Sequence, residues 1–119
     1  MALDGSLEST RFPYLPLGLT LENRSVQVEV LLDTGFDGDV AVPPGLVMNG
    51  EPPDDYLVWA LADGSEVLAP AFLGRARLGP FPEFLVLITA IGDEPLVGRG
   101  VSDRFTVTLD HGRRLIVEP

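Results

Sequence analysis

Glycine and proline interrupt this chain so often that a long helix has little room to form. Of its 119 residues, 13 are Gly and 11 are Pro, and both residue types break helices and favour turns. Between the breaks, apolar residues alternate with others, as in residues 15–21, where Leu occupies every second position. A period of two is typical of a half-buried strand. The sequence therefore predicts an all-β fold of short strands, either a closed barrel or a sandwich.

The sequence pattern divides the chain into a short N-terminal tail and one domain. The length fits one domain of about 100 to 150 residues, and neither a linker nor an internal repeat is visible. We expect residues 12–119 to form the domain and residues 1–11, rich in Ser, Asp, Glu and Gly, to be a flexible tail. Pro16 and Gly18 share one face of the first strand, which indicates an edge position in the sheet.

The remaining alternating segments predict the other elements. Asp63 and Gly64 lie between two apolar runs, which is a strong signal for a hairpin. Residues 101–105 are typical of a single helical turn, so we expect one short helix near the C-terminus. The further strands are expected at residues 26–32, 40–42, 56–61, 66–72, 73–78, 84–88, 105–109 and 115–117.

The composition excludes several kinds of catalytic chemistry. The chain has no Cys, so disulfides, thiolate zinc sites and Cys nucleophiles are all absent. All eight basic residues are Arg, which excludes a Schiff-base or P-loop lysine. His111, the single histidine, is expected in a surface turn and leaves little for a His-based metal site or triad. We expect no cofactor.

The charge and the hydropathy of the chain argue against several classes of partner. The net charge of −10 argues against a nucleic-acid partner, which would need a basic face. No apolar run approaches the 18 or more residues of a membrane helix, and the first residues lack the pattern of a signal peptide, so a cytoplasmic protein is expected. The first 66 residues hold 12 acids and two arginines, whereas the rest hold six of each.

The segment Asp33-Thr34-Gly35 is the strongest candidate for chemistry. The acid directly follows two leucines at the end of an apolar run, and a carboxylate there is costly unless it is paired or hydrogen-bonded. On the tripeptide alone, a strand end at which Asp caps a turn and Gly takes a positive φ is an equally good interpretation.

A calcium loop does not fit the acids around this segment. An EF-hand that begins at Asp33 would place Gly35 at position 3 and Pro44 at position 12, where acidic ligands are required. We therefore expect no metal, and we interpret Asp37 and Asp39 as solvated acids on the loop after the motif.

Three features in this order resemble the retroviral-like (retropepsin-like) aspartic peptidases, in particular their small single-domain prokaryotic forms. The first is Asp33-Thr34-Gly35 after an apolar strand. The second is residues 56–67, which look like the flap hairpin of that family. The third is Leu96-Val97-Gly98, which resembles the family's hydrophobic-hydrophobic-Gly signature and precedes a short helix. The closing strands, 105–110 and 115–117, also match, so the resemblance covers roughly residues 12–119.

The resemblance implies an aspartic endopeptidase that works as a homodimer on peptide or protein substrates. The chain holds one Asp-Thr-Gly, so each subunit would supply one Asp33 to the catalytic pair. Thr34 would brace the two catalytic loops, Gly35 would let the backbone approach substrate or water, and Leu96, Val97 and Gly98 would support the loop from behind. Substrate contacts would come from Phe36 and from the flap residues Trp59, Ala62, Asp63 and Gly64.

This interpretation comes with three departures from the family pattern and with one alternative. Bulky Phe36 follows the motif where viral relatives carry small residues, and the flap tip at Ala62 to Ser65 is less rich in glycine. The C-terminal Pro119 would stop strand pairing early, which leaves the mode of dimer assembly open. The alternative is a non-catalytic dimeric β-barrel module that binds extended peptide in the same cleft.

Overall fold

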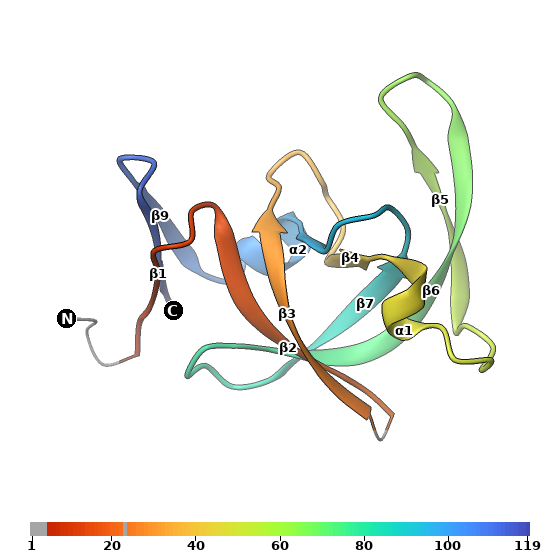
Figure 1. The fold of residues 1–119 in the computed structure, drawn as a ribbon, viewed down its shortest axis with the longest axis horizontal. Helices are drawn as coiled ribbons and strands as arrows, with labels where there is room; N and C mark the ends of the chain where they lie inside the picture. Colours follow the sequence, from red (N-terminus) through yellow and green to blue (C-terminus); the bar gives the residue numbers. More distant parts are fainter. Residues whose placement is uncertain (1–4, 23) are drawn as a thin grey trace.

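The computed structural model describes residues 5–22 and 24–119, which form ten strands and two four-residue helices. The elements in chain order are β1 (Leu7–Ser9), β2 (Tyr14–Leu21), β3 (Arg24–Leu32), β4 (Val40–Val42), α1 (Pro44–Val47), β5 (Asp55–Ala60), β6 (Glu66–Leu78), β7 (Phe84–Ala90), β8 (Leu96–Val97), α2 (Arg99–Ser102), β9 (Thr106–Asp110) and β10 (Arg114–Glu118). The predicted all-β class is confirmed, and Figure 1 shows the strands wrapping around a common centre.

Six strands close into a barrel. They follow the order β2-β3-β8-β4-β7-β6, and a second pairing between β2 and β6 completes the ring. Strand β5 pairs only with the first part of β6, so the β5–β6 hairpin extends beyond the barrel (Figure 1). The hairpin is therefore an extension of β6, the longest strand of the barrel.

The core follows from the alternation in the sequence. Leu15, Leu17, Leu19 and Leu21 of β2 are at most 5% exposed, and each such burial contributes about 1.5 to 3 kcal/mol. They pack with side chains from the other barrel strands and from β10, among them Val30, Val40, Val42, Phe72, Leu78, Val86, Ile88, Val97, Leu115 and Val117.

Strand β2 is not an edge strand, contrary to the expectation from Pro16 and Gly18. It pairs with β3 along its whole length, and residues 17–20 also pair with β6. Pro16 lies just before the stretch that β6 covers, so its missing N–H leaves that second ladder intact.

Three further elements differ from the sequence prediction. The segments 66–72 and 73–78 form one continuous strand, β6, because the chain passes from the hairpin into the barrel without a turn. Helix α1 was not predicted, and α2 spans residues 99–102 instead of 101–105. Residues 7–9 of the expected flexible tail form β1, which pairs with β10, while residues 1–4 lie outside the described part.

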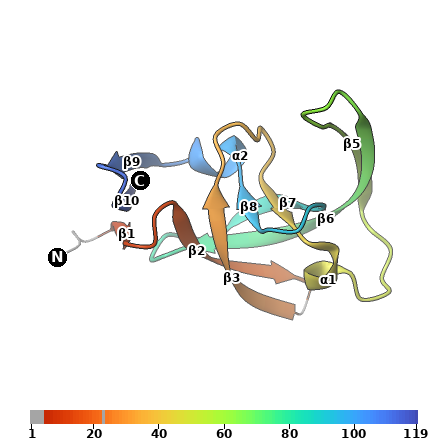
Figure 2. The same cartoon turned by 45° about the horizontal axis from the view of Figure 1, so that its top comes forward.

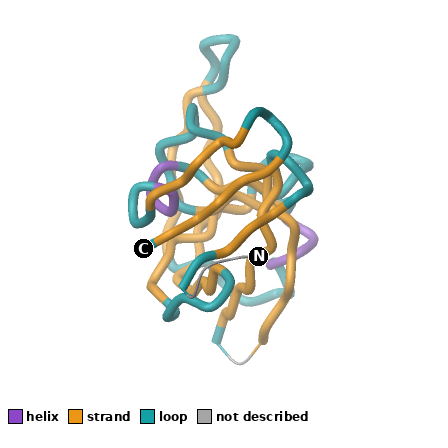
Figure 3. Tube along the Cα trace, turned by 90° about the vertical axis from the view of Figure 1, so that its left-hand side faces the viewer, coloured by secondary structure: helices purple, strands orange, loops and turns teal. Residues whose placement is uncertain are grey.

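A second sheet lies at one end of the molecule, as Figures 1 and 3 show. Its order is β1-β10-β9, and all pairs are antiparallel. The ring of Phe105 packs against Phe81 and Phe84, with centroids 5.0 and 5.9 Å away, and so fastens this sheet to the barrel. Arg114 joins its strands, because it pairs with both Glu8 of β1 and Asp110 of β9.

Candidate active site

Asp33 emerges from a strand end that is held on both sides. Leu31 and Leu32 pair with β2 on one side and with β8 on the other, where the ladder is parallel. The N–H of Asp33 donates to the carbonyl of Val97 at 2.9 Å. The apolar pair buries the strand end, and the following Asp-Thr-Gly leaves the ladder, so the position of Asp33 is fixed by the barrel.

The motif folds into a tight turn at the surface. The N–H of Gly35 donates to Oδ1 of Asp33 at 2.9 Å, and the N–H of Phe36 donates to the Asp33 carbonyl at 3.1 Å. Asp33 is half-buried, whereas Thr34 and Gly35 are exposed. This local capping orients the carboxylate while the loop remains open to a partner or a substrate.

Gly98 packs directly against the loop that follows the motif. Its N–H donates to the carbonyl of Asp39 at 2.9 Å, and the next N–H, from Arg99, donates to the carbonyl of Phe36 at 2.8 Å. A Cβ at Gly98 would collide with the carbonyl oxygens of Phe36 and Gly38. The backbone of Gly98 is extended, so the need for glycine here is one of space and not of φ.

Asp39 is a structural acid that the sequence interpretation missed. Its Oδ2 accepts a hydrogen bond of 2.8 Å from the N–H of Leu87 in β7, and its side chain leaves no room for a Cβ at Gly100. Asp39 is half-buried, so it is not the solvated acid we expected, whereas Asp37 is exposed. The carboxylate ties the end of the motif loop to the barrel wall. No local sequence signal marks this contact, because its partner in β7 lies 48 residues further along the chain.

The β5–β6 hairpin forms where Asp63 and Gly64 predicted it. Gly64 has φ of +87°, which favours glycine, and its N–H donates to the carbonyl of Leu61 at 3.0 Å. The side-chain hydroxyl and the N–H of Ser65 donate to Oδ1 of Asp63, and these bonds hold the pKa of the Asp63 carboxyl below its usual value. The turn therefore carries a negative charge, and the hydrogen bonds to the Asp63 carboxylate stabilise its conformation.

The hairpin contacts the motif loop through two aromatic rings, close to its turn. Phe36 and Trp59 lie with centroids 5.0 Å apart and planes tilted by 52°. Both rings cover Gly38, where a Cβ would collide with them. The indole Nε1 of Trp59 is buried and has no hydrogen-bond partner among the described residues. The structure thus brings Phe36 and Trp59 together, on the side of the loop that faces β5.

The tip of the hairpin is exposed to solvent. Ala62, Asp63 and Gly64 are all exposed. Figures 1 and 2 both show the hairpin curving so that its tip leans toward the side of the molecule that carries the loop after β3. The predicted site residues therefore lie on two segments, the motif loop with residues 96–98 behind it and the hairpin, and the Phe36–Trp59 contact joins the two.

Thr34 opens onto a groove of mixed polar and apolar lining. The groove has a volume of about 230 Å³ and is lined by Leu32, Thr34, Ser102, Asp103, Phe105, Val107 and Leu109. Leu109 is 58% exposed. The groove joins the motif loop to the terminal sheet.

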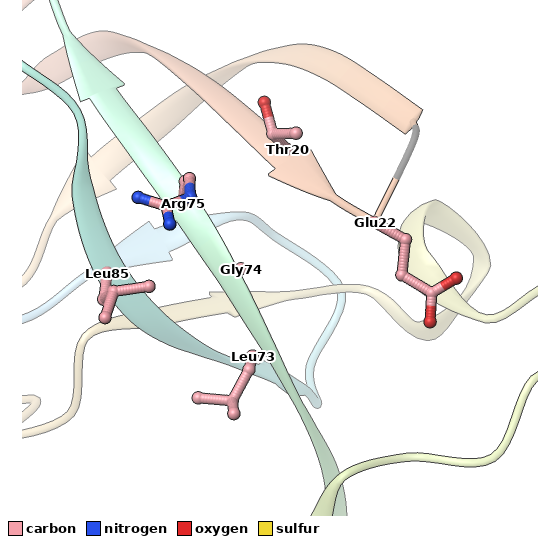
Figure 4. A pocket seen from close by; sticks show the side chains of 6 residues that line it. All are labelled: Thr20, Glu22, Leu73, Gly74, Arg75 and Leu85. Atoms are coloured by element: carbon pink, nitrogen blue, oxygen red, sulfur yellow. The ribbon is translucent and has the colours of Figure 1, made fainter.

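A second hollow lies away from the motif. It has a volume of about 240 Å³ and is lined by Thr20, Glu22, Leu73, Gly74, Arg75 and Leu85. Figure 4 shows these side chains around β6, at the outer surface of the barrel. None of the predicted site residues lines it, so it carries no part of the candidate site. In the described residues no group of three or more His, Asp or Glu is placed to hold a metal ion, and no helix is long and apolar enough to cross a membrane.

The comparisons with known proteins support the fold. No family model and no curated protein matches the sequence. Among solved structures, the chain is similar to a retropepsin-like aspartic protease from Rickettsia conorii, with a TM-score of 0.65 and 20% sequence identity over 95% of this chain and 89% of that chain. At this identity the likeness shows a retropepsin-like fold, which agrees with the expected architecture.

Proposed function

We propose that this chain is an aspartic endopeptidase that acts as a homodimer. The observation that carries the proposal is the position of Asp33. It directly follows β3, whose end lies between β2 and β8, its N–H donates to the carbonyl of Val97, and it begins the loop that Gly98 supports. The retropepsin-like fold of the Rickettsia protein supports this assignment. Because the chain holds one Asp-Thr-Gly, the second carboxyl group comes from a second copy.

The chemistry follows from two carboxyl groups that share one proton. Two carboxylates in close contact repel each other, so one of them stays protonated. The charged one takes a proton from water, the hydroxyl adds to the peptide carbonyl carbon, and the protonated one donates to the carbonyl oxygen. The resulting diol collapses as the C–N bond breaks and the amine leaves with a proton. The two groups titrate as a pair.

The residues around Asp33 position the substrate in this proposal. The β5–β6 hairpin acts as a flap that closes over bound peptide and excludes water. Thr34 braces the loop against the second subunit, and Gly35 allows close approach of the backbone. The substrate-contacting residues are proposed to be Phe36, Trp59, Ala62, Asp63 and Gly64.

The test is digestion of a peptide mixture by the wild type and by Asp33→Asn. The asparagine keeps the shape of the side chain and its capping oxygen, so fold and dimer should persist while cleavage falls to background. Asp93→Asn, an exposed acid on another loop, is the matched control and should cleave normally. Binding of peptide without cleavage by the wild type would favour the non-catalytic module instead. Full activity from a verified monomer would contradict the shared site.

A further inference from the structure

The β5–β6 hairpin turns one of its two faces toward the motif loop. Trp59 and Val67 are half-buried on this face and lie directly opposite each other in the ladder. Side chains alternate between the two faces of a strand, and Tyr56 and Leu68 on the other face are 54% and 62% exposed. A peptide that the hairpin covers in the proposed function therefore runs along the face that carries Trp59.

The ring of Phe36 is fixed in place on the loop side of this path. A Cβ at Gly38 would lie 2.5 Å from Cζ of the ring, and a Cβ at Gly98 would lie 2.6 Å from its Cδ2, so the ring rests against two glycine backbones. Trp59 contacts it from the hairpin, with centroids 5.0 Å apart. The indole Nε1 of Trp59 is buried without a hydrogen-bond partner among residues 5–22 and 24–119, so water does not reach this atom. Two aromatic rings therefore fill the space between the hairpin and the turn that Asp33 begins.

Resting on the proposed function, we infer that this ring pair restricts the substrate to small side chains at the position that passes it. A leucine or phenylalanine side chain of the peptide would meet two rings already in contact, and it could enter only if they separated. A subsite for a large side chain would need a free aromatic face, whereas Phe36 lies against Trp59 and two glycines. Gly, Ala or Ser in the peptide brings few side-chain atoms and passes with the rings in place.

The proposed homodimer applies this restriction twice. In a two-fold symmetric dimer both subunits present the same residues, one set on each side of the axis. An extended peptide that crosses the axis passes one Phe36–Trp59 pair before the cleaved bond and the other pair after it. The substrate class is therefore an extended peptide with small residues at two positions, each the same number of residues from the cleaved bond.

Two degenerate peptide libraries test the restriction, one complete and one without Gly, Ala and Ser. Steric exclusion from a filled subsite should make cleavage of the second library slower by about tenfold or more in the wild type. Mass spectrometry of the products from the complete library should show Gly, Ala and Ser enriched at two positions related by symmetry about the cleaved bond. Equal rates on both libraries, or large residues at every position, would overturn the restriction.

Ring variants assign the restriction to its residues. Phe36→Ala opens the space from the motif loop and should reduce the ratio of the two rates to below about threefold. Trp59→Leu opens the same space from the hairpin and should reduce the ratio as well. Tyr56→Ala removes an exposed ring from the opposite face of β5 and should keep the wild-type ratio. Circular dichroism verifies that each variant is folded, and a ratio that neither ring variant changes would overturn the assignment.

The fluorescence of Trp59, the single tryptophan of the chain, separates this inference from the proposed function. In Asp33→Asn, titration with each library reports peptide binding without cleavage, and the complete library should reach half-saturation at a concentration about tenfold lower. This difference in binding, together with no cleavage by the wild type, would support the restriction and contradict the peptidase. Equal binding of the two libraries, together with equal cleavage by the wild type, would support the peptidase and overturn the restriction. A protein that neither binds nor cleaves peptide would overturn both.

Discussion

The ring of Phe36, three residues after Asp33, packs against the ring of Trp59 in the β5–β6 hairpin with centroids 5.0 Å apart. This contact links the loop that carries the motif to the arm that extends beyond the barrel. Gly38 lies beneath both rings, and the loop is held from the other side by Gly98. The position of the turn end of the hairpin and the shape of the motif loop therefore depend on each other.

A double-mutant cycle measures this dependence. Phe36→Leu and Trp59→Leu each remove one ring, and their coupling energy in urea unfolding should be about 0.5 to 1.5 kcal/mol. The control pairs Trp59→Leu with Phe105→Leu, because Phe105 packs on Phe81 and Phe84 instead. That coupling should lie within about 0.5 kcal/mol of zero. Equal coupling in both cycles would show that the Phe36–Trp59 contact has no energetic role.

Gly98→Ala should damage the motif loop directly. The new methyl group meets two carbonyl oxygens of that loop, and overpacking of this kind costs about 1 to 3 kcal/mol or more. We expect a lower midpoint in chemical denaturation and a loss of peptide cleavage. Gly45→Ala is the control, because nothing lies within 4 Å of its Cβ and it sits in α1. It should be neutral or slightly stabilising, and a Gly98→Ala variant as stable as this control would contradict the close packing.

Asp39→Ala should destabilise the protein more than its exposed neighbour. Removal of the carboxylate leaves the N–H of Leu87, a half-buried residue, without this partner, which costs about 0.5 to 1.5 kcal/mol. Asp39→Asn keeps an acceptor oxygen and should recover most of the loss. Asp37→Ala, at an exposed position, should change the unfolding free energy by less than about 0.5 kcal/mol. Equal effects at positions 37 and 39 would count against a structural role for Asp39.

The strands were predictable because their alternation is local. Leu15 to Leu21 shows its period in the sequence, and the same side chains form the core. The continuity of β6 was not predictable, because Ala71 and Phe72 are buried side by side where the strand passes into the barrel, and this interrupts the alternation between the expected strands 66–72 and 73–78. The pairing of β2 with β6 joins residues far apart in the chain, which periodicity cannot reveal.

The candidate site was predictable only as separate segments. The resemblance identified Asp33 and Gly98, but the packing of Gly98 against the loop that follows Asp33 depends on β8 lying between β3 and β4. Asp39 was missed because its partner, the N–H of Leu87, lies 48 residues away. An acid between a glycine and a valine on a loop gives no sign of such a bond. The sequence pattern therefore predicted that the Asp39 side chain would be exposed to solvent.

The pH dependence of stability should include a contribution from Asp110. Hydrogen bonds from His111 and Arg114 hold the pKa of the Asp110 carboxyl below its usual value. A carboxyl group whose pKa is lowered by folding stabilises the protein above its unfolded-state pKa of about 4, and this contribution is lost as the pH falls through the folded value. The difference in stability between wild type and Asp110→Asn should therefore be constant near neutral pH and shrink below about pH 4.

Urea unfolding at a series of pH values checks this expectation. Asp93→Asn, which removes an exposed acid from another loop, should show a small difference at every pH. If the wild type and Asp110→Asn differed by the same amount at pH 2.5 and pH 7, the pairing with Arg114 and His111 would not contribute to stability.

The negative charge at the hairpin tip should select among substrates. Asp63 is exposed and its pKa is lowered by Ser65, and the first 66 residues carry most of the acids. Such a field attracts basic peptides and repels acidic ones. At about 10 mM salt, where the Debye length is about 30 Å, we expect kcat/KM for a Lys-flanked peptide to exceed that for its Glu-flanked counterpart by about tenfold. The ratio should approach one near 1 M salt, where screening acts within about 3 Å.

Asp63→Asn separates the tip from the rest of the field. It should lower the preference for basic peptides at low salt while leaving the ratio at high salt unchanged, because the long-range attraction from one charge is removed and the hairpin turn still has Gly64 at its positive φ. Asp103→Asn removes one charge near the terminal sheet instead and should alter the preference less. Equal effects from the two variants would mean that net charge alone sets the selectivity, and equal cleavage of both peptides by the wild type at low salt would exclude an electrostatic contribution from the tip.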